Sequence, residues 1–372
     1  MLDSIHNAGC FRDKARNRIL HMDQYMSLIL LYMFNPICGS LRAVQQASEL
    51  KKVQRILGCS RASLGSLSEA STVFDSKLME QIVQNISSQL KPISGNRKLN
   101  EIDAILTAVD GKLINALPKM TWALWKKDMM AIKAHTHFDI QKHVPVRITI
   151  TDGNGDERQV LADNLESGRI YVKDRGYASL TLFQQILDNQ SSFVCRIKDN
   201  SVYESLEDFE LTDDVLKAGI VFDKKVRLGS NDKTKNQLSV PIRLVAIKCR
   251  PHKKRYKISR GGPEQGEMLL IATDIFDMEA DVIALIFEHR WAVETFFNFF
   301  KHVLGCRHLL SYNQNGIELQ TYAAIIACML ISLWTGRKPT LRTYEMLCWY
   351  FTGMADEEEL LAHIAKLQKQ DC

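Results

Sequence analysis

The spacing of apolar residues predicts helices toward both ends of the chain. Tyr25–Phe34 is an almost unbroken apolar segment, and the apolar positions of Asp75–Leu90 recur with the period of an amphipathic helix. Toward the other end, Tyr322–Trp334 is a second apolar segment, and Lys338–Gln370 also has a helical pattern. Because both apolar segments are shorter than the roughly 18–20 residues that cross a bilayer, we expect buried core helices and no membrane partner.

Residues 40–70 have the pattern of short helices joined by a tight turn. Ser40–Glu49 and Leu50–Leu57 each suit a short helix, and Gly58 and Ser60 supply a helix-ending glycine and then an N-cap for Arg61–Ala70. This pattern is compatible with a DNA-binding helix-turn-helix. The alternative is a small helical bundle with solvated basic side chains. On the DNA-binding interpretation, the residues facing DNA are Arg61, Ser63, Ser66, Lys51, Lys52 and Arg55.

From residue 101 the chain changes to alternating strands and helices. A meander of strands followed by helix, strand, helix and strand is typical of an α/β domain with a mixed sheet. The predicted strands are Ile102–Val109, Lys112–Leu117, Ala131–Ile140, Val144–Thr151, Arg169–Lys173 and Ser192–Ile197, and the predicted helices are Glu157–Leu165 and Leu180–Asn189.

Between residues 199 and 278, strand patterns separated by turn signals predict a mostly antiparallel, β-rich insertion. A long helix follows at about 279–303. The predicted strands of the insertion are Gly219–Leu228, Gln237–Lys248, Arg255–Ile258 and Met268–Asp274. We therefore divide the chain into a helical region (1–95), the first part of an α/β core (96–198), the insertion (199–278), the last core helix (279–310) and a C-terminal helical region (311–372).

Composition is that of a soluble globular protein, with 46% hydrophobic and 24% charged residues. The formal net charge of +5 is too small to indicate a nucleic-acid partner by itself, so such an argument must rest on local patches. The nine scattered cysteines form no C-x-x-C pair, which favours free thiols in a reducing compartment. With no signal-peptide pattern at the start, we expect a cytoplasmic protein.

Two aspartates stand out by their placement. Asp110 follows the predicted strand Ile102–Val109 and precedes Gly111, and Asp174 follows the strand Arg169–Lys173 in the same way. Open α/β sheets bind ligands at the carboxyl ends of their strands, which favours a functional site here. An Asp near a Gly is also an ordinary turn residue, so neither position is decisive alone.

The third acidic residue, Glu294, lies on the predicted helix 279–303. At about 100° per residue, an α-helix places Phe287, Arg290, Glu294 and Lys301 on one narrow face. One interpretation is a solvated face of i,i+4 ion pairs. However, a helix with four Phe between residues 296 and 300 must be largely buried. The stripe is therefore better explained as the lining of a site for an anionic polymer and a divalent cation.

Two aspartates and a glutamate suit Mg²⁺ or Mn²⁺, because these hard ions prefer oxygen ligands. A pair of such ions about 4 Å apart activates the attacking oxygen and stabilises the leaving oxygen in phosphodiester displacement. Carboxylates repel DNA, so nearby Arg and Lys must hold the phosphates.

Two further features have a DNA-binding interpretation and a structural one. Trp291 is able to stack on an unpaired base, although its position on the helical wheel favours packing in the core. The most basic stretch, residues 250–260, includes Lys253, Lys254 and Arg255. We expect it to form a DNA-facing edge of the insertion, the alternative being a solvated loop.

These residues resemble the DDE class of bacterial insertion-sequence transposases, specifically insertion sequence family four, whose catalytic core is RNase H-like. The pattern Y-x2-R-x3-E-x6-K is matched by Arg290, Glu294 and Lys301, with Phe287 where Tyr is usual. Asp174-Arg-Gly-Tyr177 closes a strand as in the family, and Asp110-Gly111 is correctly placed. The resemblance runs over nearly the whole chain, and residues 175–293 leave room for the family's insertion.

The resemblance implies a cut-and-paste transposase that depends on Mg²⁺ or Mn²⁺. Asp110, Asp174 and Glu294 would bind two ions, water would cleave a strand at the transposon end, and the freed 3′-OH would attack target DNA. Arg290 and Lys301 would hold phosphates of the transposon end. The DNA contacts that we expect in all are Arg290, Lys301, Phe287, Trp291, Arg175, Lys253, Lys254 and Arg255.

The resemblance also sets expectations for the whole assembly. Residues 1–95 would bind transposon-end DNA, and residues 311–372 would form homodimer contacts in a nucleoid-associated bacterial complex. Phe287 lacks the phenolic hydroxyl that contacts phosphate in the family. Two alternatives stay open: a catalytically silent DNA-binding protein derived from a transposase, and a metal-dependent nuclease that does not join DNA.

Overall fold

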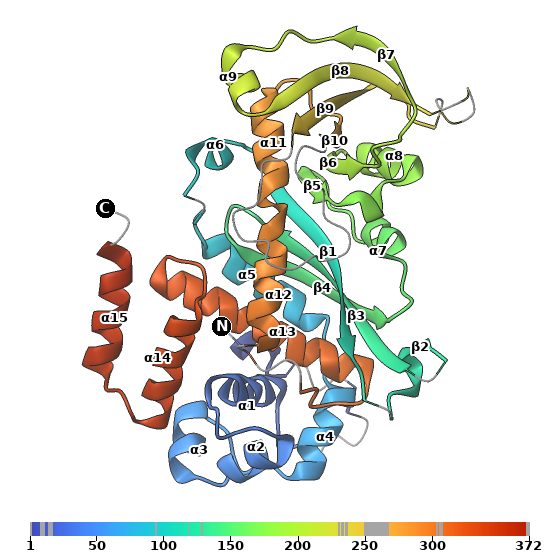
Figure 1. Cartoon of the computed structure of the whole chain (residues 1–372). Coiled ribbons are helices and arrows are strands. Elements are labelled where there is room, and N and C mark those ends of the chain that lie inside the picture. The colour runs from blue at the N-terminus through green and yellow to red at the C-terminus, as the bar shows by residue number, and fades with distance from the viewer. Residues whose placement is uncertain are drawn as a thin grey trace.

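The centre of the molecule is one mixed ten-stranded sheet with helices on both faces (Figure 1). The structure is a computed structural model. It describes residues 2–7, 12–13, 18–93, 95–117, 119–127, 129–229, 231, 234, 237–248, 268–302, 304 and 308–369.

Half of the sheet has the strand order of an RNase H-like core. Three strands form an antiparallel meander, β1 (Ile105–Asn115), β3 (Met129–Asp139) and β4 (Val144–Asp152). Two more, β5 (Arg169–Lys173) and β6 (Ser192–Ile197), run parallel to β1, giving the order β4-β3-β1-β5-β6. The short β2 (Leu124–Lys126) pairs with the start of β3. The predicted fold class is confirmed.

The predicted strands Ile102–Val109 and Lys112–Leu117 are in fact one continuous strand, β1, so that prediction was wrong. The ladder with β3 runs without interruption from Thr107 to Asn115 and pairs Asp110 with Thr136. The Asp-Gly pair does not turn the chain here, because β3 offers backbone partners on both sides of it. Asp110 therefore projects from the middle of a strand.

The insertion continues the core sheet instead of forming a separate one. Its strands β7 (Tyr203–Asp208), β8 (Ile220–Leu228), β9 (Ile242–Lys248) and β10 (Met268–Thr273) pair antiparallel in turn. Strand β10 also pairs antiparallel with β6. The expectation of a mostly antiparallel insertion is confirmed, while the predicted strand Arg255–Ile258 lies outside the described residues. A short helix, α9 (Asp213–Lys217), links β7 and β8.

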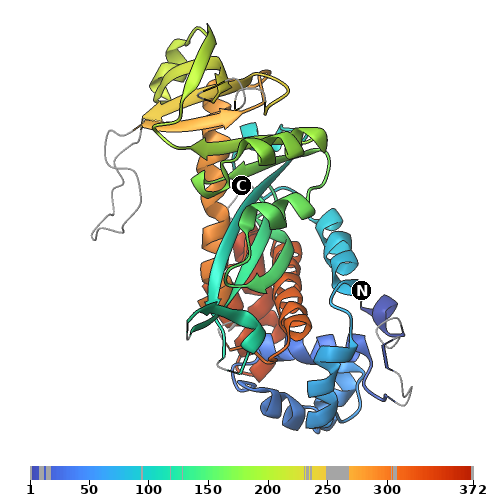
Figure 2. The same ribbon diagram turned by 90° about the vertical axis from the view of Figure 1, so that its right-hand side faces the viewer.

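Alternating residues of the strands belong to two hydrophobic cores, one on each face of the sheet. In β5, Ile170 and Val172 join the larger cluster and Tyr171 the smaller one. The smaller cluster is covered by α7 (Glu157–Asp163) and α8 (Leu180–Asp188), which lie in front of the sheet in Figure 2.

The opposite face is covered by a column of two helices, α11 (Ala280–Glu288) and α12 (Ala292–His302) (Figure 1). A 3₁₀ turn at His289–Trp291 separates them. The prediction of helical structure over about 279–303 therefore agrees with the described residues, but the expectation of one continuous α-helix was wrong.

The apolar segment near residue 322 is the core of α13 (Gln314–Thr335). It is long and apolar enough to span a membrane, but 83% of its most apolar window is buried inside the protein. It packs on β4, α1 (Met22–Phe34), α4 (Leu64–Val73) and α5 (Leu78–Gln89). The expected buried core helix is confirmed. Two further helices follow it, α14 (Leu341–Thr352) and α15 (Glu357–Lys369).

The N-terminal helices include α2 (Leu41–Ala47) and α3 (Lys51–Leu57). As predicted, Gly58 ends α3 in the left-handed region with φ +61°. The predicted N-cap Ser60 is wrong: α4 begins at Leu64, and the hydroxyl of Ser63 accepts the Ser66 N–H at 3.0 Å. Arg61 lies before the helix and pairs with Glu49 at 3.0 Å. The small elements that remain are Asp3–Ile5, α6 (Arg97–Asn100) and Thr121–Ala123.

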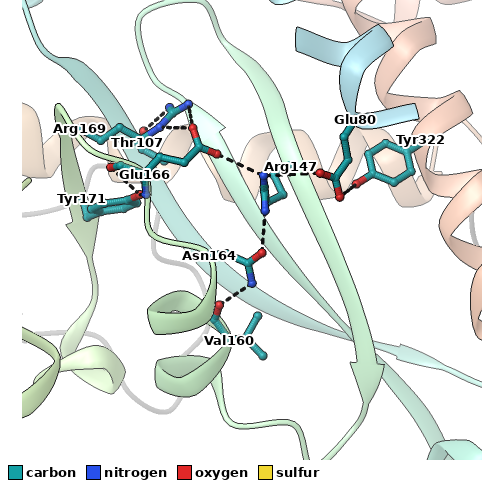
Figure 3. A network of polar contacts seen from close by, with 9 residues as sticks. All are labelled: Glu80, Thr107, Arg147, Val160, Asn164, Glu166, Arg169, Tyr171 and Tyr322. Atoms are coloured by element: carbon teal, nitrogen blue, oxygen red, sulfur yellow. Dashed lines mark hydrogen bonds and ion pairs between the residues drawn. The ribbon is translucent and has the colours of Figure 1, made fainter. Parts of the chain in front are cut away.

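Arg147 of β4 joins the helices to the sheet through a polar network (Figure 3). Its guanidinium lies 3.6 Å from Glu80 of α5 and 3.5 Å from Glu166. Glu80 accepts a hydrogen bond from Tyr322 of α13, and Glu166 pairs with Arg169 of β5. One arginine thus links two helices with two strands of the core.

A buried ion pair attaches the insertion to the start of α11. Arg243 of β9 donates two hydrogen bonds to the carboxylate of Asp223 on β8, at 2.8 and 2.6 Å. Its remaining nitrogen donates to the carbonyls of Ile275 and Met278, which precede α11. The side chains are 7% and 4% exposed. The pair therefore fixes where the helix column begins.

We predict that Arg243→Ala lowers the free energy of unfolding by about 3–5 kcal/mol, because it leaves the Asp223 carboxylate buried without a partner. Urea denaturation followed by circular dichroism measures this. Lys224→Ala, in the neighbouring strand β8, is the matched control. It breaks the exposed pair with Asp208 and should change stability far less. Equal losses in the two variants would contradict the prediction.

Candidate active site

Parallel pairing brings the two predicted aspartates to neighbouring strands. Ala108 of β1 is the register partner of Val172 of β5, and each aspartate follows two residues later. Since side chains alternate along a strand, Asp110 lies on the same side as Ala108, the side covered by the α11–α12 column, and Asp174 directly follows the neighbouring strand β5. This register places the two residues at equivalent positions of neighbouring chain segments.

The two aspartates differ in backbone setting. Asp110 lies within β1, beyond the point where β5 stops at Lys173. Asp174 begins the 3₁₀ turn Arg175–Tyr177, and its carboxylate accepts the N–H of Arg175 at 2.7 Å. Asp174 therefore depends on a turn for its position, whereas Asp110 is held by a strand.

The helix column supplies the third acid. Helix α12 packs on β1, and Glu294 in its first turn accepts a hydrogen bond from Arg290 at 3.1 Å. Arg290 lies in the 3₁₀ turn and is 6% exposed. The i,i+4 pair is present, but it is not the solvated surface pair considered as an alternative.

The pKa of Asp110 depends on its burial and on the charged side chains around it. Burial is the main cause that raises its pKa to about 6, and Glu294 and Glu157 raise the pKa further. Arg290 acts in the opposite direction by favouring the carboxylate. Three carboxylates and one buried guanidinium therefore interact at this edge of the sheet.

Glu157 is the residue that sequence reasoning missed. It is the first residue of α7, its carboxylate lies 3.4 Å from Lys133 of β3, and it raises the pKa of Tyr177 in addition to the larger effect of burial. No sequence signal separates it from an ordinary helix start, because acidic residues are generally favoured in the first turn of a helix. Only the packing of α7 on β1 reveals its position.

The residues expected to contact DNA differ in how exposed they are in the structure. Trp291 is 56% exposed, so the interpretation that it packs in the core was wrong, because the 3₁₀ turn departs from the ideal wheel. Phe287 is 9% exposed and faces the core. Arg175 is exposed on its turn. The side chain of Lys301 and all of Lys253, Lys254 and Arg255 lie outside the described residues.

The donor chemistry suits a hard divalent cation, since Asp110, Asp174 and Glu294 all offer carboxylate oxygens. In the part of the chain that the structure describes, no three His, Cys, Asp or Glu side chains are close enough together to hold an ion. Glu294 is engaged by Arg290. The residue types therefore fit a metal, while a closed set of ligands is not formed in this conformation.

Comparison with known proteins identifies the family. A family model described as "Transposase DDE domain" matches residues 102–330, and the chain belongs to this family. It is 26% identical over 234 residues to a protein of Sinorhizobium fredii named as a transposase (y4zB), matching 62% of this chain and 61% of that protein. The chain thus spans about three fifths of that relative's length.

Two further proteins show a similarity to this chain. A Synechocystis protein named as a transposase of insertion sequence element IS4SA is 21% identical over 277 residues, 73% of this chain and 71% of that protein. The piggyBac transposase in a synaptic complex with hairpin DNA is 12% identical with a TM-score of 0.39, covering 92% of this chain and 75% of that one. The family match and the named relatives confirm the resemblance to insertion-sequence transposases.

We predict that replacing Asp110 makes stability less dependent on pH. Its folded pKa of about 6 lies above the ordinary value of 3.8, so folding favours the protonated carboxyl. The stabilisation is present at low pH and is lost as pH rises through 6. Asp110→Asn, which stays neutral, should therefore exceed the unaltered chain in stability at pH 8 by on the order of 2 kcal/mol, and by little at pH 4.5.

Denaturant unfolding between pH 4.5 and 8, in buffer with a chelator, measures this difference. Glu294→Gln should lower the pKa of Asp110, since Glu294 raises it, and should shift the pH dependence toward lower pH. A stability difference between Asp110→Asn and the unaltered chain that stays constant over this range would contradict the prediction.

Proposed function

We propose that this chain is a DNA transposase that cleaves strands at the ends of an insertion sequence and joins them to target DNA. The observation that carries the proposal is the position of Asp110 on β1 beside Arg290 and Glu294 of the helix column, with Asp174 directly after the neighbouring strand β5, in a chain of the transposase DDE family.

Asp110, Asp174 and Glu294 are the proposed ligands of divalent metal, Mg²⁺ or alternatively Mn²⁺. When bound, such ions stabilise the attacking and leaving oxygens of a phosphodiester displacement. In the first reaction, water attacks the phosphorus, the P–O3′ bond breaks, and the free 3′-OH remains on one strand. In the second, that 3′-OH attacks a target phosphodiester and a target 3′-OH leaves.

The basic and aromatic residues have supporting roles in this proposal. Arg290 compensates the charge of Glu294 inside the protein and favours the ionised form of Asp110. Arg175 and Trp291, both exposed beside the acidic residues in sequence, are proposed to contact the DNA backbone and an unpaired base. Lys301 is proposed to hold a phosphate.

We assign further roles to the two helical regions. Residues 1–95 are proposed to bind transposon-end DNA through the exposed Lys51, Lys52 and Arg55 of α3. Residues 311–372 are proposed to form homodimer contacts, supported by the exposed aromatic residues Trp349 and Phe351 of α14. Residues 96–198 and 279–310 would form the catalytic core around the insertion 199–278, and the protein would act on the bacterial nucleoid.

We predict that Asp110→Ala, Asp174→Ala and Glu294→Ala each abolish strand cleavage while leaving transposon-end binding largely intact. The loss should exceed the roughly 10–100-fold reduction typical of residues outside the metal's own ligands. The substrate is a labelled duplex carrying the inverted repeat that flanks the gene, assayed in Mg²⁺ and separately in Mn²⁺.

Asp188→Ala is the control, because it removes an exposed carboxylate at the end of α8. Normal nicking by any of the three variants would show that its residue is not part of the site. Products in which the transposon end is joined to a target plasmid distinguish a transposase from a nuclease and from a silent DNA-binding protein.

A further inference from the structure

A glycine in β1 lets a fourth carboxylate approach the acidic site. A Cβ atom added at Gly111, the neighbour of Asp110, would lie 2.7 Å from both the carboxyl carbon and one oxygen of Glu157. Any larger residue at position 111 would displace that carboxylate. The absence of a side chain at Gly111 therefore creates the space that Glu157 fills.

The first residues of α7 also contact the turn that begins at Asp174. Burial raises the pKa of the Tyr177 hydroxyl well above its ordinary value, and the neighbouring Glu157 carboxylate raises it further. The next residue, Arg158, donates from its guanidinium to the carbonyl of Gly176 at 3.0 Å. Glu157 thus acts on the Tyr177 side chain of the 3₁₀ turn Arg175–Tyr177, and Arg158 holds the backbone of the same turn.

Capping of α7 does not account for this arrangement. Asp156 already serves as the N-cap, and its carboxylate accepts the N–H groups of Arg158 and Gln159 at 2.8 and 3.4 Å. The carboxylate of Glu157 is turned instead toward β1, Lys133 and Tyr177. Its side chain is 31% exposed, so it keeps access to solvent and to ions.

We propose that Glu157 is a positioning residue of the acidic site, which holds the Asp174 turn against β1 through Tyr177 and adds negative charge that favours a divalent cation beside Asp110. This inference rests on the proposed function. Its electrostatic part agrees with the influence of Glu157 on Asp110, whose pKa it raises.

Mn²⁺ binding to the full chain without DNA tests the inference, measured by isothermal titration calorimetry at pH 8. Glu157→Gln keeps the size of the side chain and a carbonyl oxygen beside Tyr177, but removes the charge. We expect Mn²⁺ to bind about 10- to 100-fold more weakly, the range typical of groups that act on a metal through its ligands. Glu157→Ala should weaken binding further, because it also releases Tyr177.

The matched control is Asp163→Asn, which removes one negative charge from the exposed far end of the same helix. It should bind Mn²⁺ as the unaltered chain does. Circular dichroism melting of every variant establishes that it is folded.

Gly111→Ala provides an independent perturbation, because it displaces the carboxylate while Glu157 is retained. It should weaken Mn²⁺ binding, and combining it with Glu157→Ala should add little, since both changes remove the same interaction. As a second readout, carboxyl ¹³C NMR should show a lower pKa of Asp110 in Glu157→Gln, which loss of packing alone would not produce.

The outcomes separate this inference from the proposed function. If Asp110→Asn abolishes Mn²⁺ binding but Glu157→Gln binds Mn²⁺ as the unaltered chain does, the role of Glu157 is overturned and the metal site stands. Full additivity of Gly111→Ala and Glu157→Ala would also overturn it. If the unaltered chain binds no Mn²⁺, both are overturned.

Discussion

The arrangement of the acidic site depends on one buried guanidinium. Arg290 is almost fully enclosed, and a buried charge is tolerated where it is paired and hydrogen-bonded. Its ion pair with Glu294 holds that side chain, and its charge opposes the other influences on Asp110. Without it, carboxylates from β1, α7 and α12 would face one another with no buried cation of the helix column to offset their repulsion.

The 3₁₀ turn explains how one arginine reaches this position. An unbroken α-helix would direct residues 290 and 291 as the helical wheel predicts, with Trp291 toward the core. In the structure, Arg290 is buried and Trp291 is exposed, with the guanidinium carbon 5.4 Å from the indole ring centroid. The turn thus leaves Trp291 exposed while Arg290 lies on the inner side.

Much of the fold follows from local patterns in the sequence. The bounds of β5 and β6 match the predicted strands, because each is a short buried run with turn residues at its ends. The equivalent positions of Asp110 and Asp174 follow from the parallel pairing of β1 and β5, although Asp110 lies within its strand and not at its end. The continuity of β1 was not predictable, because it depends on pairing with β3, which is distant in sequence. Glu157 was missed for the same reason: its significance comes from a contact with Gly111, not from its neighbours in the chain.

The continuity of the sheet has a consequence at its far end. Among the residues that the structure describes, no strand pairs with the outer edge of β7, the last strand of the sheet, and such an edge can recruit a strand from another molecule. Five of its six residues are exposed, and three of them are the charged residues Glu204, Glu207 and Asp208. Burying these charges against an identical edge would be unfavourable, so the long sheet is protected against edge-to-edge aggregation.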